Sequence, residues 1–234
     1  IEDAAHAVET VAQGRKVGTI GDATCFSFYV TKNVITGEGG MVTTENEQVA
    51  NWIKTAGLHG LTKDAWKRYS DEGFRHYEVI FPGFKYNMMD LQAAIGIHQL
   101  ARVEENHARR EQLWREYDEA FQDLPIDRPA PLAAGDRHAR HLYTLLLRLE
   151  ELRWSRDRVM EALHKEGIGT GIHYSALHLH PFYRETYGYR SGRFPETEWI
   201  SERTLSIPFS TKLTRQDSGD VIRGVRRVLG AARR

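Results

Sequence analysis

A short apolar stretch that ends in a lysine and a glycine-rich turn constrains the fold of this chain more than any other feature. Residues 23–30 are mostly apolar and aromatic, which is typical of a buried strand, and Lys32 follows closely. A Gly-Glu-Gly-Gly turn at residues 37–40 then leads into a second apolar run at 41–44. Because burial disfavours the charged form of a lysine, Lys32 is a candidate nucleophile and base. The alternative is an ordinary surface lysine at the end of a strand.

The composition argues against several classes of partner. The 234 residues can form one large domain or two small ones. The 32 basic and 32 acidic residues cancel, so the net charge gives no argument for binding nucleic acid or a membrane surface. The single cysteine, Cys25, cannot form a disulfide within the chain and is compatible with a reducing compartment. No apolar run approaches the roughly 18 residues of a membrane span. We therefore expect a cytoplasmic protein without nucleic-acid or membrane partners.

Two polar residues accompany the apolar stretch. Asp3 follows a short predicted strand, and open α/β sheets bind their ligands at the carboxyl ends of strands. Asp3 would serve equally well as the N-cap of a helix that begins at the next residue, and His6 would share its helical face. Ser27 interrupts the apolar stretch with a hydroxyl group. A buried hydroxyl needs a partner, which either the backbone or a bound phosphate could supply.

The rest of the chain alternates between helical and strand patterns. We expect helices over residues 46–58, 90–124, 155–165 and from 214 onward, with Asp90, Ser155 and Thr214 at their starts. Apolar runs at 141–149, 168–174 and 205–209 predict strands. Residues 125–136 are rich in Pro, Ala and Gly and indicate a crossing into a second, smaller domain. The pattern predicts an α/β fold.

Several motifs in combination resemble a known family. They are Glu-Asp-Ala-Ala-His-Ala at 2–7, Gly-Asp-x-x-Cys-Phe-Ser-Phe at 21–28, Thr-Lys-Asn at 31–33 and Thr-Gly-Glu-Gly-Gly-Met-Val at 36–42. This combination resembles the DegT/DnrJ/EryC1/StrS family of nucleotide-sugar aminotransferases, which depend on pyridoxal phosphate. Further signatures at 82–96, 171–174 and 195–203 extend the resemblance over essentially the whole chain. The stretch 64–69, Asp-Ala-Trp-Lys-Arg-Tyr, resembles the branch that includes the UDP-4-amino-4-deoxy-L-arabinose aminotransferase.

The resemblance implies a role for five residues. Lys32 matches the lysine that forms a Schiff base with pyridoxal phosphate, and Asp3 matches the aspartate that pairs with the pyridine nitrogen. His6 matches a residue beside the cofactor ring or its 3-oxygen, and Ser27 matches a serine that binds the phosphate. Asn87 matches an asparagine that reaches the cofactor phosphate of the other subunit, which implies a homodimer with shared active sites.

The chemistry explains why the family needs these residue types. Pyridoxal phosphate acts as an electron sink when its ring nitrogen stays protonated. A carboxylate 4 Å from that nitrogen contributes about 4 kcal/mol at an effective dielectric constant near 20. This energy corresponds to roughly three pKa units. A positioned lysine that moves the substrate proton is typically worth about 10² to 10⁴ in rate.

The resemblance also implies fold and organisation. We expect fold type I of the pyridoxal-phosphate-dependent transferases, which is aspartate aminotransferase-like. Residues 1–105 would be the C-terminal part of the large cofactor-binding domain, and residues 106–234 a long linking helix and a small α/β domain. Because the sequence starts at Ile1, within the first family motif, we expect it to be the C-terminal portion of a longer polypeptide.

The expected function is transfer of an amino group from L-glutamate to a nucleotide-linked keto sugar, in the biosynthesis of surface polysaccharide, lipopolysaccharide or natural-product sugars. His173 and His178 match a segment that contacts the nucleotide sugar in the family, although Ser175 and Ala176 depart from its usual sequence. One alternative is a sugar dehydratase, but that branch carries a histidine where this chain has Lys32. A second is a non-catalytic binding module of the same fold. A third, a metal hydrolase using His173, His178 and His180, matches no standard zinc spacing, and we assign no metal site.

Overall fold

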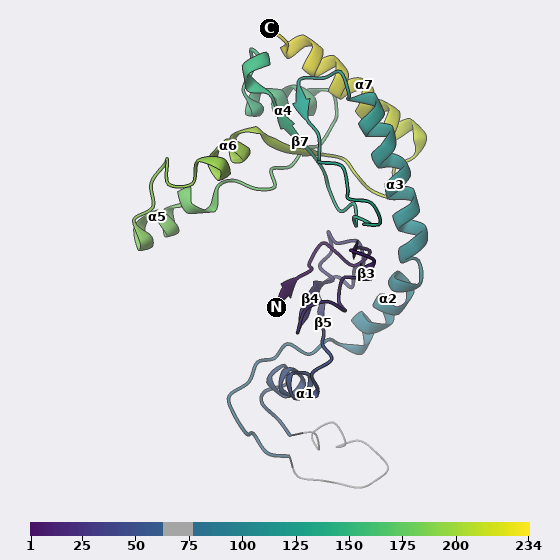
Figure 1. Ribbon diagram of the computed structural model, residues 1–234, viewed down its shortest axis with the longest axis vertical. Coiled ribbons are helices and arrows are strands. Elements are labelled where there is room, and N and C mark those ends of the chain that lie inside the picture. Colours follow the sequence, from purple (N-terminus) through teal and green to yellow (C-terminus); the bar gives the residue numbers. More distant parts are fainter. Residues whose placement is uncertain (63–76) are drawn as a thin grey trace. The chain divides into compact units, whose positions relative to one another are not determined.

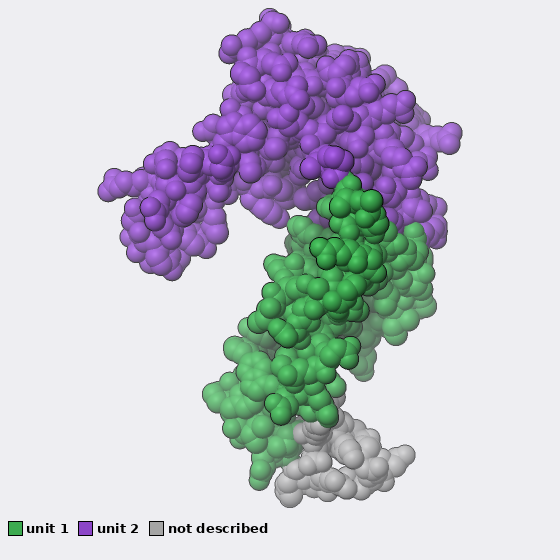
Figure 2. Space-filling view, in the orientation of Figure 1, with its two compact units in different colours: residues 1–104, 132–139 green, residues 105–131, 140–234 purple. Residues whose placement is uncertain are grey.

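The computed structural model describes residues 1–62 and 77–234, which divide into two compact units (Figures 1 and 2). Unit 1 comprises Ile1–Glu104 and Leu132–Ala139, and unit 2 comprises Glu105–Pro131 and Arg140–Arg234. The stretch 64–69, which indicated one branch of the family, lies outside the described residues. Within the described residues, no helix has the length and the apolar character that crossing a membrane requires.

Unit 1 is built on a small mixed sheet. Its strands are β1 (Glu2–Asp3), β4 (Thr24–Ser27) and β5 (Gly40–Thr43), in the order β1-β4-β5. β1 runs parallel to β4, and β4 runs antiparallel to β5. A separate hairpin pairs β2 (Val11–Ala12) with β3 (Arg15–Lys16). The two strands expected around Lys32 are therefore present, although the first of them ends at Ser27.

The helix expected after Asp3 does not form. Asp3 Oδ1 instead accepts a hydrogen bond from the Ala5 backbone N–H at 3.0 Å, which closes a turn. The N–H groups of Ala7 and Thr10 then bond to carbonyls three residues earlier, at 3.0 and 3.1 Å. An aspartate side chain competes with helical hydrogen bonding in this way, and the chain enters β2 at Val11.

The expected helix at 46–58 is confirmed as α1 (Glu47–Ala56). Asn46 caps it, because its side chain accepts hydrogen bonds from the N–H groups of Gln48 and Val49 at 2.9 and 3.2 Å. Gly57 occupies the C-cap position.

The long helix expected over residues 90–124 is two helices. α2 (Asp90–Ala101) ends at Arg102, and α3 (Val103–Ala120) follows. Arg102 leaves helical geometry at φ −104° and ψ 6°, and its N–H bonds to the Gln99 carbonyl three residues back. Asp90 is the first helical residue rather than the N-cap, which is Met89. The Gln92 side chain reaches back to accept the Met89 N–H at 3.0 Å.

Unit 2 is an antiparallel sheet packed against helices. The sheet contains β6 (Ile126–Asp127), β7 (Tyr143–Leu147) and β8 (Thr204–Ile207), in that order. The helices are most of α3, together with α4 (Arg156–Lys165), α5 (Pro181–Tyr187), α6 (Pro195–Arg203) and α7 (Arg215–Ala232), with short turns η2 (Leu149–Glu151) and η3 (Leu177–Leu179). The expected starts of α4 and α7 are confirmed, because Ser155 and Thr214 accept N–H groups of the first turn.

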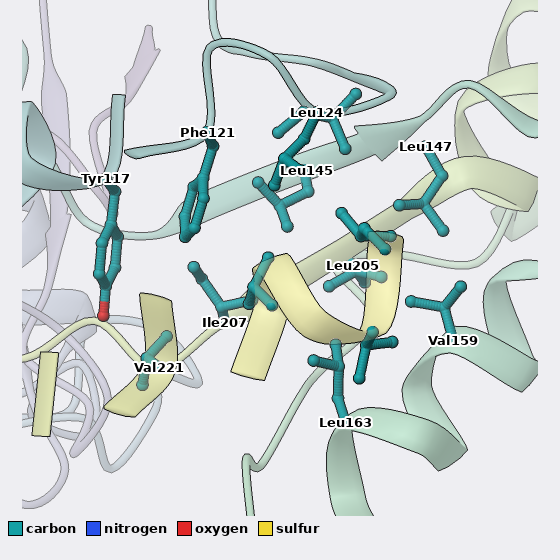
Figure 3. Packing of buried hydrophobic residues seen from close by; sticks show 14 of the residues in the cluster. Tyr117, Phe121, Leu124, Leu145, Leu147, Val159, Leu163, Leu205, Ile207 and Val221 are labelled. Atoms are coloured by element: carbon teal, nitrogen blue, oxygen red, sulfur yellow. The ribbon is translucent and has the colours of Figure 1, made fainter. Parts of the chain in front are cut away.

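The hydrophobic core lies in unit 2. Alternate residues of β7 are buried, and α3, α4 and α7 supply the side chains that meet them (Figure 3). Leu145, Leu147 and Leu205 are at most 1% exposed, and burying such a side chain is worth about 1.5 to 3 kcal/mol. By contrast, α2 of unit 1 has no buried residue within the described structure, and its apolar Leu91, Ile97 and Leu100 are exposed.

One expectation for unit 2 is wrong, and two of its helices were not predicted. Residues 168–174 form no strand, and only Gly171 bridges to Ser206 of β8. The helices α5 and α6 were not expected, because both are short and their patterns give a weak helical signal. Each has a proline within its first turn, which is compatible with a helix start.

Candidate active site

The register of the β1–β4–β5 sheet groups two of the predicted cofactor residues. Asp3 pairs with Cys25 in the parallel ladder. Side chains of directly paired residues share a face, and every second residue of a strand returns to that face. Asp3, Cys25 and Ser27 therefore lie on one face of the sheet, with Asp3 and Ser27 at the carboxyl ends of β1 and β4.

Both groups keep hydrogen-bonding capacity. Asp3 is exposed and uses Oδ1 for the Ala5 N–H, while Oδ2 accepts no hydrogen bond from the described residues. Ser27 Oγ accepts the Tyr29 N–H over 3.4 Å, a long contact that leaves the hydroxyl proton available to a second partner. The carboxylate and the hydroxyl can thus bind a ligand at this edge without breaking a strong bond.

Lys32 lies in the turn that follows β4. Its own N–H donates to the Tyr29 carbonyl at 2.8 Å, and the Thr36 N–H donates to the Phe28 carbonyl at 2.9 Å, so the turn folds back onto the residues that directly follow β4. The Lys32 side chain is half-buried. Within the described residues its Nζ makes no hydrogen bond or ion pair, which leaves the amine available for a ligand.

The glycines that follow are required by the backbone. Gly39 has φ +155°, and a Cβ placed there would collide with Thr36 Oγ1 and lie 2.8 Å from Met88 Cε. The Glu38 carbonyl accepts both the Thr36 hydroxyl at 2.6 Å and the Gln92 side-chain amide at 2.9 Å. The turn is therefore closed on both sides, and only glycine fits at position 39.

Asn87 lies at a different point in unit 1. Its Oδ1 accepts a hydrogen bond from Lys85 Nζ, and it lines a pocket of about 820 Å³. The pocket is also lined by Cys25 and Val42, which share the sheet face of Asp3 and Ser27. The structure thus brings Asp3 and Ser27 onto the face that borders this pocket. Neither these two residues nor Lys32 lines it, and Asn87 makes no hydrogen bond to them.

The remaining predicted residues have other surroundings. His6 is exposed in the turn after β1. In unit 2, His173 Nδ1 lies 2.7 Å from Ser206 Oγ. His178 is buried, and its Nε2 lies 2.9 Å from Glu198 Oε1. Each of the two unit 2 histidines has one ring nitrogen engaged by a neighbouring side chain, so a substrate would meet only the other nitrogen.

The Glu198 carboxylate joins the residues around His178, which we call the His178 site. The carboxylate accepts the Ser191 hydroxyl at 2.6 Å and the Gly192 N–H at 2.8 Å, besides its contact with His178. These bonds lower the pKa of Glu198 to about 2, and the bond from Ser191 has the largest effect. In the described part of the chain, no group of three or more His, Cys, Asp or Glu side chains is arranged to hold a metal ion.

Two residues beside Lys32 were missed by sequence reasoning. Asn33 is 8% exposed and Glu9 is fully buried, and the two are hydrogen-bonded to each other. Asn33 could have been found as the neighbour of Lys32 in the Thr-Lys-Asn motif. Glu9 gives no local signal, because 24 residues separate it from Asn33.

The donor set of this site fits pyridoxal phosphate. A carboxylate with a free oxygen suits a protonated ring nitrogen, a hydroxyl with a free proton suits a phosphate oxygen, and an unpaired amine suits an aldehyde. Asp3, Ser27 and Lys32 supply these three groups within one unit, at one end of one sheet.

Comparisons with known proteins agree with the geometry. The model of the DegT/DnrJ/EryC1/StrS aminotransferase family matches residues 1–226. The chain is 50% identical to the uncharacterized protein MJ1066 of Methanocaldococcus jannaschii, over 100% of this chain and 60% of that protein. It is 45% identical to the spore coat polysaccharide biosynthesis protein SpsC of Bacillus subtilis, over 99% of this chain and 60% of SpsC. The chain thus spans about three-fifths of the length of these relatives.

A solved structure shows the same fold. The putative sugar aminotransferase Spr1654 of Streptococcus pneumoniae, in its PMP-form, superposes with a TM-score of 0.87 at 31% identity, over 98% of this chain and 58% of that one. The same protein has been solved in a PLP-form. The expected fold type I of the pyridoxal-phosphate-dependent transferases is confirmed by this likeness.

Proposed function

The chain belongs to the DegT/DnrJ/EryC1/StrS aminotransferase family, and we propose that the protein moves an amino group from L-glutamate to a nucleotide-linked keto sugar with pyridoxal phosphate as cofactor. The grouping of Asp3, Ser27 and Lys32 at one end of the β1–β4–β5 sheet carries the proposal. The similarity to SpsC, a spore coat polysaccharide biosynthesis protein, and to Spr1654, a putative sugar aminotransferase, supports a sugar as the substrate.

Lys32 does the central chemistry in this proposal. Bound pyridoxal phosphate supplies an electron sink for the charge that develops at the substrate carbon. The Lys32 amine, which makes no hydrogen bond or ion pair within the described residues, would hold the cofactor and, once displaced by the amino donor, would move the proton at that carbon. The retained lysine also favours transamination over the dehydratase alternative.

Asp3 and Ser27 bind and orient. The Ala5 N–H fixes Asp3 Oδ1, and this bond leaves Oδ2 to face a ring nitrogen. Ser27 offers its hydroxyl proton to a phosphate oxygen, and Asn87 offers its side-chain amide. We propose that Asn87 serves the active site of a second subunit, so that the protein works as a homodimer. His6, His173 and His178 stay proposed contacts of cofactor and substrate.

Borohydride reduction followed by peptide mass mapping tests the proposal. Reduction of the purified protein with pyridoxal phosphate fixes the cofactor on the lysine that carries it. We expect the added mass on Lys32, and Lys54, exposed on α1, serves as the internal control. An adduct on other lysines with none on Lys32 contradicts the proposal. A change of the visible spectrum on addition of glutamate, reversed by a nucleotide-linked keto sugar, supports transamination, and no response to glutamate argues against it.

A further inference from the structure

The residue that follows Lys32 in the sequence, Asn33, belongs to a buried polar pair. The side-chain amide of Asn33 donates to both carboxylate oxygens of Glu9, at 3.0 Å each, and to the Ala139 carbonyl at 2.8 Å. Glu9 is 0% exposed and Asn33 is 8% exposed. Three acceptors therefore fix the side chain of the residue that follows Lys32 in the sequence.

The carboxylate of Glu9 lies at a well-anchored point of unit 1. The Glu9 carbonyl accepts Arg137 Nε at 2.7 Å, and the backbone of Arg137 pairs with Val11 in both directions, at 2.8 and 2.9 Å. The guanidinium of Arg137 also binds both carboxylate oxygens of Glu104, at 2.8 and 3.0 Å. These bonds fasten residues 9–11 to residues 137–139, and Asn33 bonds to both segments.

A buried carboxylate is costly unless it is hydrogen-bonded, and Asn33 supplies a bond to each oxygen of Glu9. We infer that Glu9, acting through Asn33, is a positioning residue that fixes the direction in which the Lys32 amine points. On its N-terminal side Lys32 is held by its own N–H bond to the Tyr29 carbonyl at 2.8 Å. On its C-terminal side it is held by Asn33, so the chain is fixed on both sides of the lysine, while Nζ makes no bond to any described residue.

Such control matters because the reaction tolerates little displacement. A shift of about 1 Å in a reacting group can cost roughly 100-fold in rate. The role of the pair rests on the proposed function, in which Lys32 is the reacting group. The effect of the pair on the Lys32 amine is independent of the proposed function, because that effect can be measured without cofactor or substrate.

The first test measures the reactivity of Lys32 without cofactor. A short pulse of an amine-acylating reagent is applied to wild type, Asn33→Ala and Glu9→Gln, and labelling of Lys32 is read by peptide mass spectrometry against Lys54. We expect the ratio of Lys32 to Lys54 labelling to change at least about five-fold in Asn33→Ala. The change should be smaller in Glu9→Gln, which keeps one acceptor for Asn33. An unchanged labelling ratio in folded variants overturns the inference. If Asn33→Ala does not fold, the labelling ratio of Glu9→Gln alone decides.

The second test separates positioning from stability. Thr24→Val removes a buried side-chain hydrogen bond at a different place in unit 1, on β4, where the fully buried Thr24 hydroxyl donates to Glu2 Oε2 at 2.6 Å. We expect this control to lower the melting temperature without changing Lys32 labelling. With cofactor and substrates, kcat of Glu9→Gln should fall about 10-fold or more while KM changes less than about three-fold. A fall in kcat for Thr24→Val equal to that for Glu9→Gln contradicts a positioning role. If the borohydride-reduced cofactor is found on a residue other than Lys32 while the ratio of Lys32 to Lys54 labelling still changes in the variants, the proposed function is wrong but the positioning role is supported.

Discussion

Asp3 and Cys25 are direct partners in the parallel ladder that joins β1 to β4. This pairing sets the position of Asp3 relative to Ser27, because Ser27 lies two residues beyond Cys25, about 7 Å along the strand. A slip of one residue would turn Asp3 to the opposite face of the sheet. The backbone register, rather than any contact between the two side chains, therefore decides that a carboxylate and a hydroxyl can meet one ligand.

Replacing Lys32 tests its chemical role against a structural one. Lys32→Arg keeps the positive charge but removes the primary amine, so we expect kcat to fall at least about 100-fold. Because Nζ has no partner within the described residues, the free energy of unfolding should change by less than about 0.5 kcal/mol. Steady-state kinetics and denaturant unfolding measure the two effects, with Lys54→Arg as the matched control. Wild-type activity in Lys32→Arg would rule out Lys32 as the reacting group.

Asp3→Asn removes the charge of Asp3 and keeps its shape. The amide oxygen still accepts the Ala5 N–H, so the turn should survive. The lost carboxylate is worth about 4 kcal/mol at 4 Å and an effective dielectric constant near 20, or roughly three pKa units of the bound ring nitrogen. We expect kcat to fall about 100-fold or more, and the pKa of the bound ring nitrogen, followed by nitrogen NMR of isotope-labelled cofactor, to fall. An unchanged pKa of the ring nitrogen would show that Asp3 does not face the ring.

Local signals explain which parts of this fold could be predicted from the sequence. Asn46, Ser155 and Thr214 each cap a helix through bonds to residues two or three positions away, so the neighbouring sequence contains the whole signal. Asp3 misled for the same reason, because its side chain stabilises a turn as readily as a helix start. The residues that follow Asp3 decide between a turn and a helix, and here they lead into the β2–β3 hairpin.

Non-local pairing explains what could not be predicted. The Glu9–Asn33 bond joins residues that are 24 positions apart, and the bond from Asn33 to Ala139 spans 106 positions. The spacing of apolar residues along the sequence cannot indicate partners that are so far apart in the chain. The family motif indicated Asp3, Ser27 and Lys32 together, but only the strand register shows that Asp3 and Ser27 share a face. Asn87 lines a pocket beside that face, which none of these three residues lines.

Substitution of the turn glycines tests whether the Lys32 turn is sterically locked. Gly39→Ala combines φ +155° with a collision against Thr36 and Met88, so we expect a loss of about 1 to 3 kcal/mol in the free energy of unfolding. Gly37→Ala is the matched control, because Gly37 has φ +87° but no atom within 4 Å of the added methyl group. Gly37→Ala should lower the free energy of unfolding by about 1 kcal/mol. Equal losses in chemical denaturation would mean that the collision at Gly39 relaxes freely.

Glu198 should make the stability of unit 2 depend on acid. Its pKa falls from 4.5 to about 2, with the Ser191 hydroxyl as the largest cause, then the Gly192 N–H and His178. A carboxyl group with a lowered pKa binds fewer protons in the folded state than in the unfolded state. Its contribution to stability is therefore complete above pH 4.5 and is lost as the pH falls towards 2.

The measurement compares wild type with Glu198→Gln across that range of pH. We expect the wild type to be the more stable protein at pH 6 and the difference in melting temperature to shrink steadily between pH 4.5 and 2. Asp217→Asn is a useful control, because Asp217 also has a lowered pKa but its partner is the Thr214 cap of α7 rather than His178. If the wild type and Glu198→Gln lose stability in parallel over the whole range, the carboxylate is not the acid-sensitive group of the His178 site.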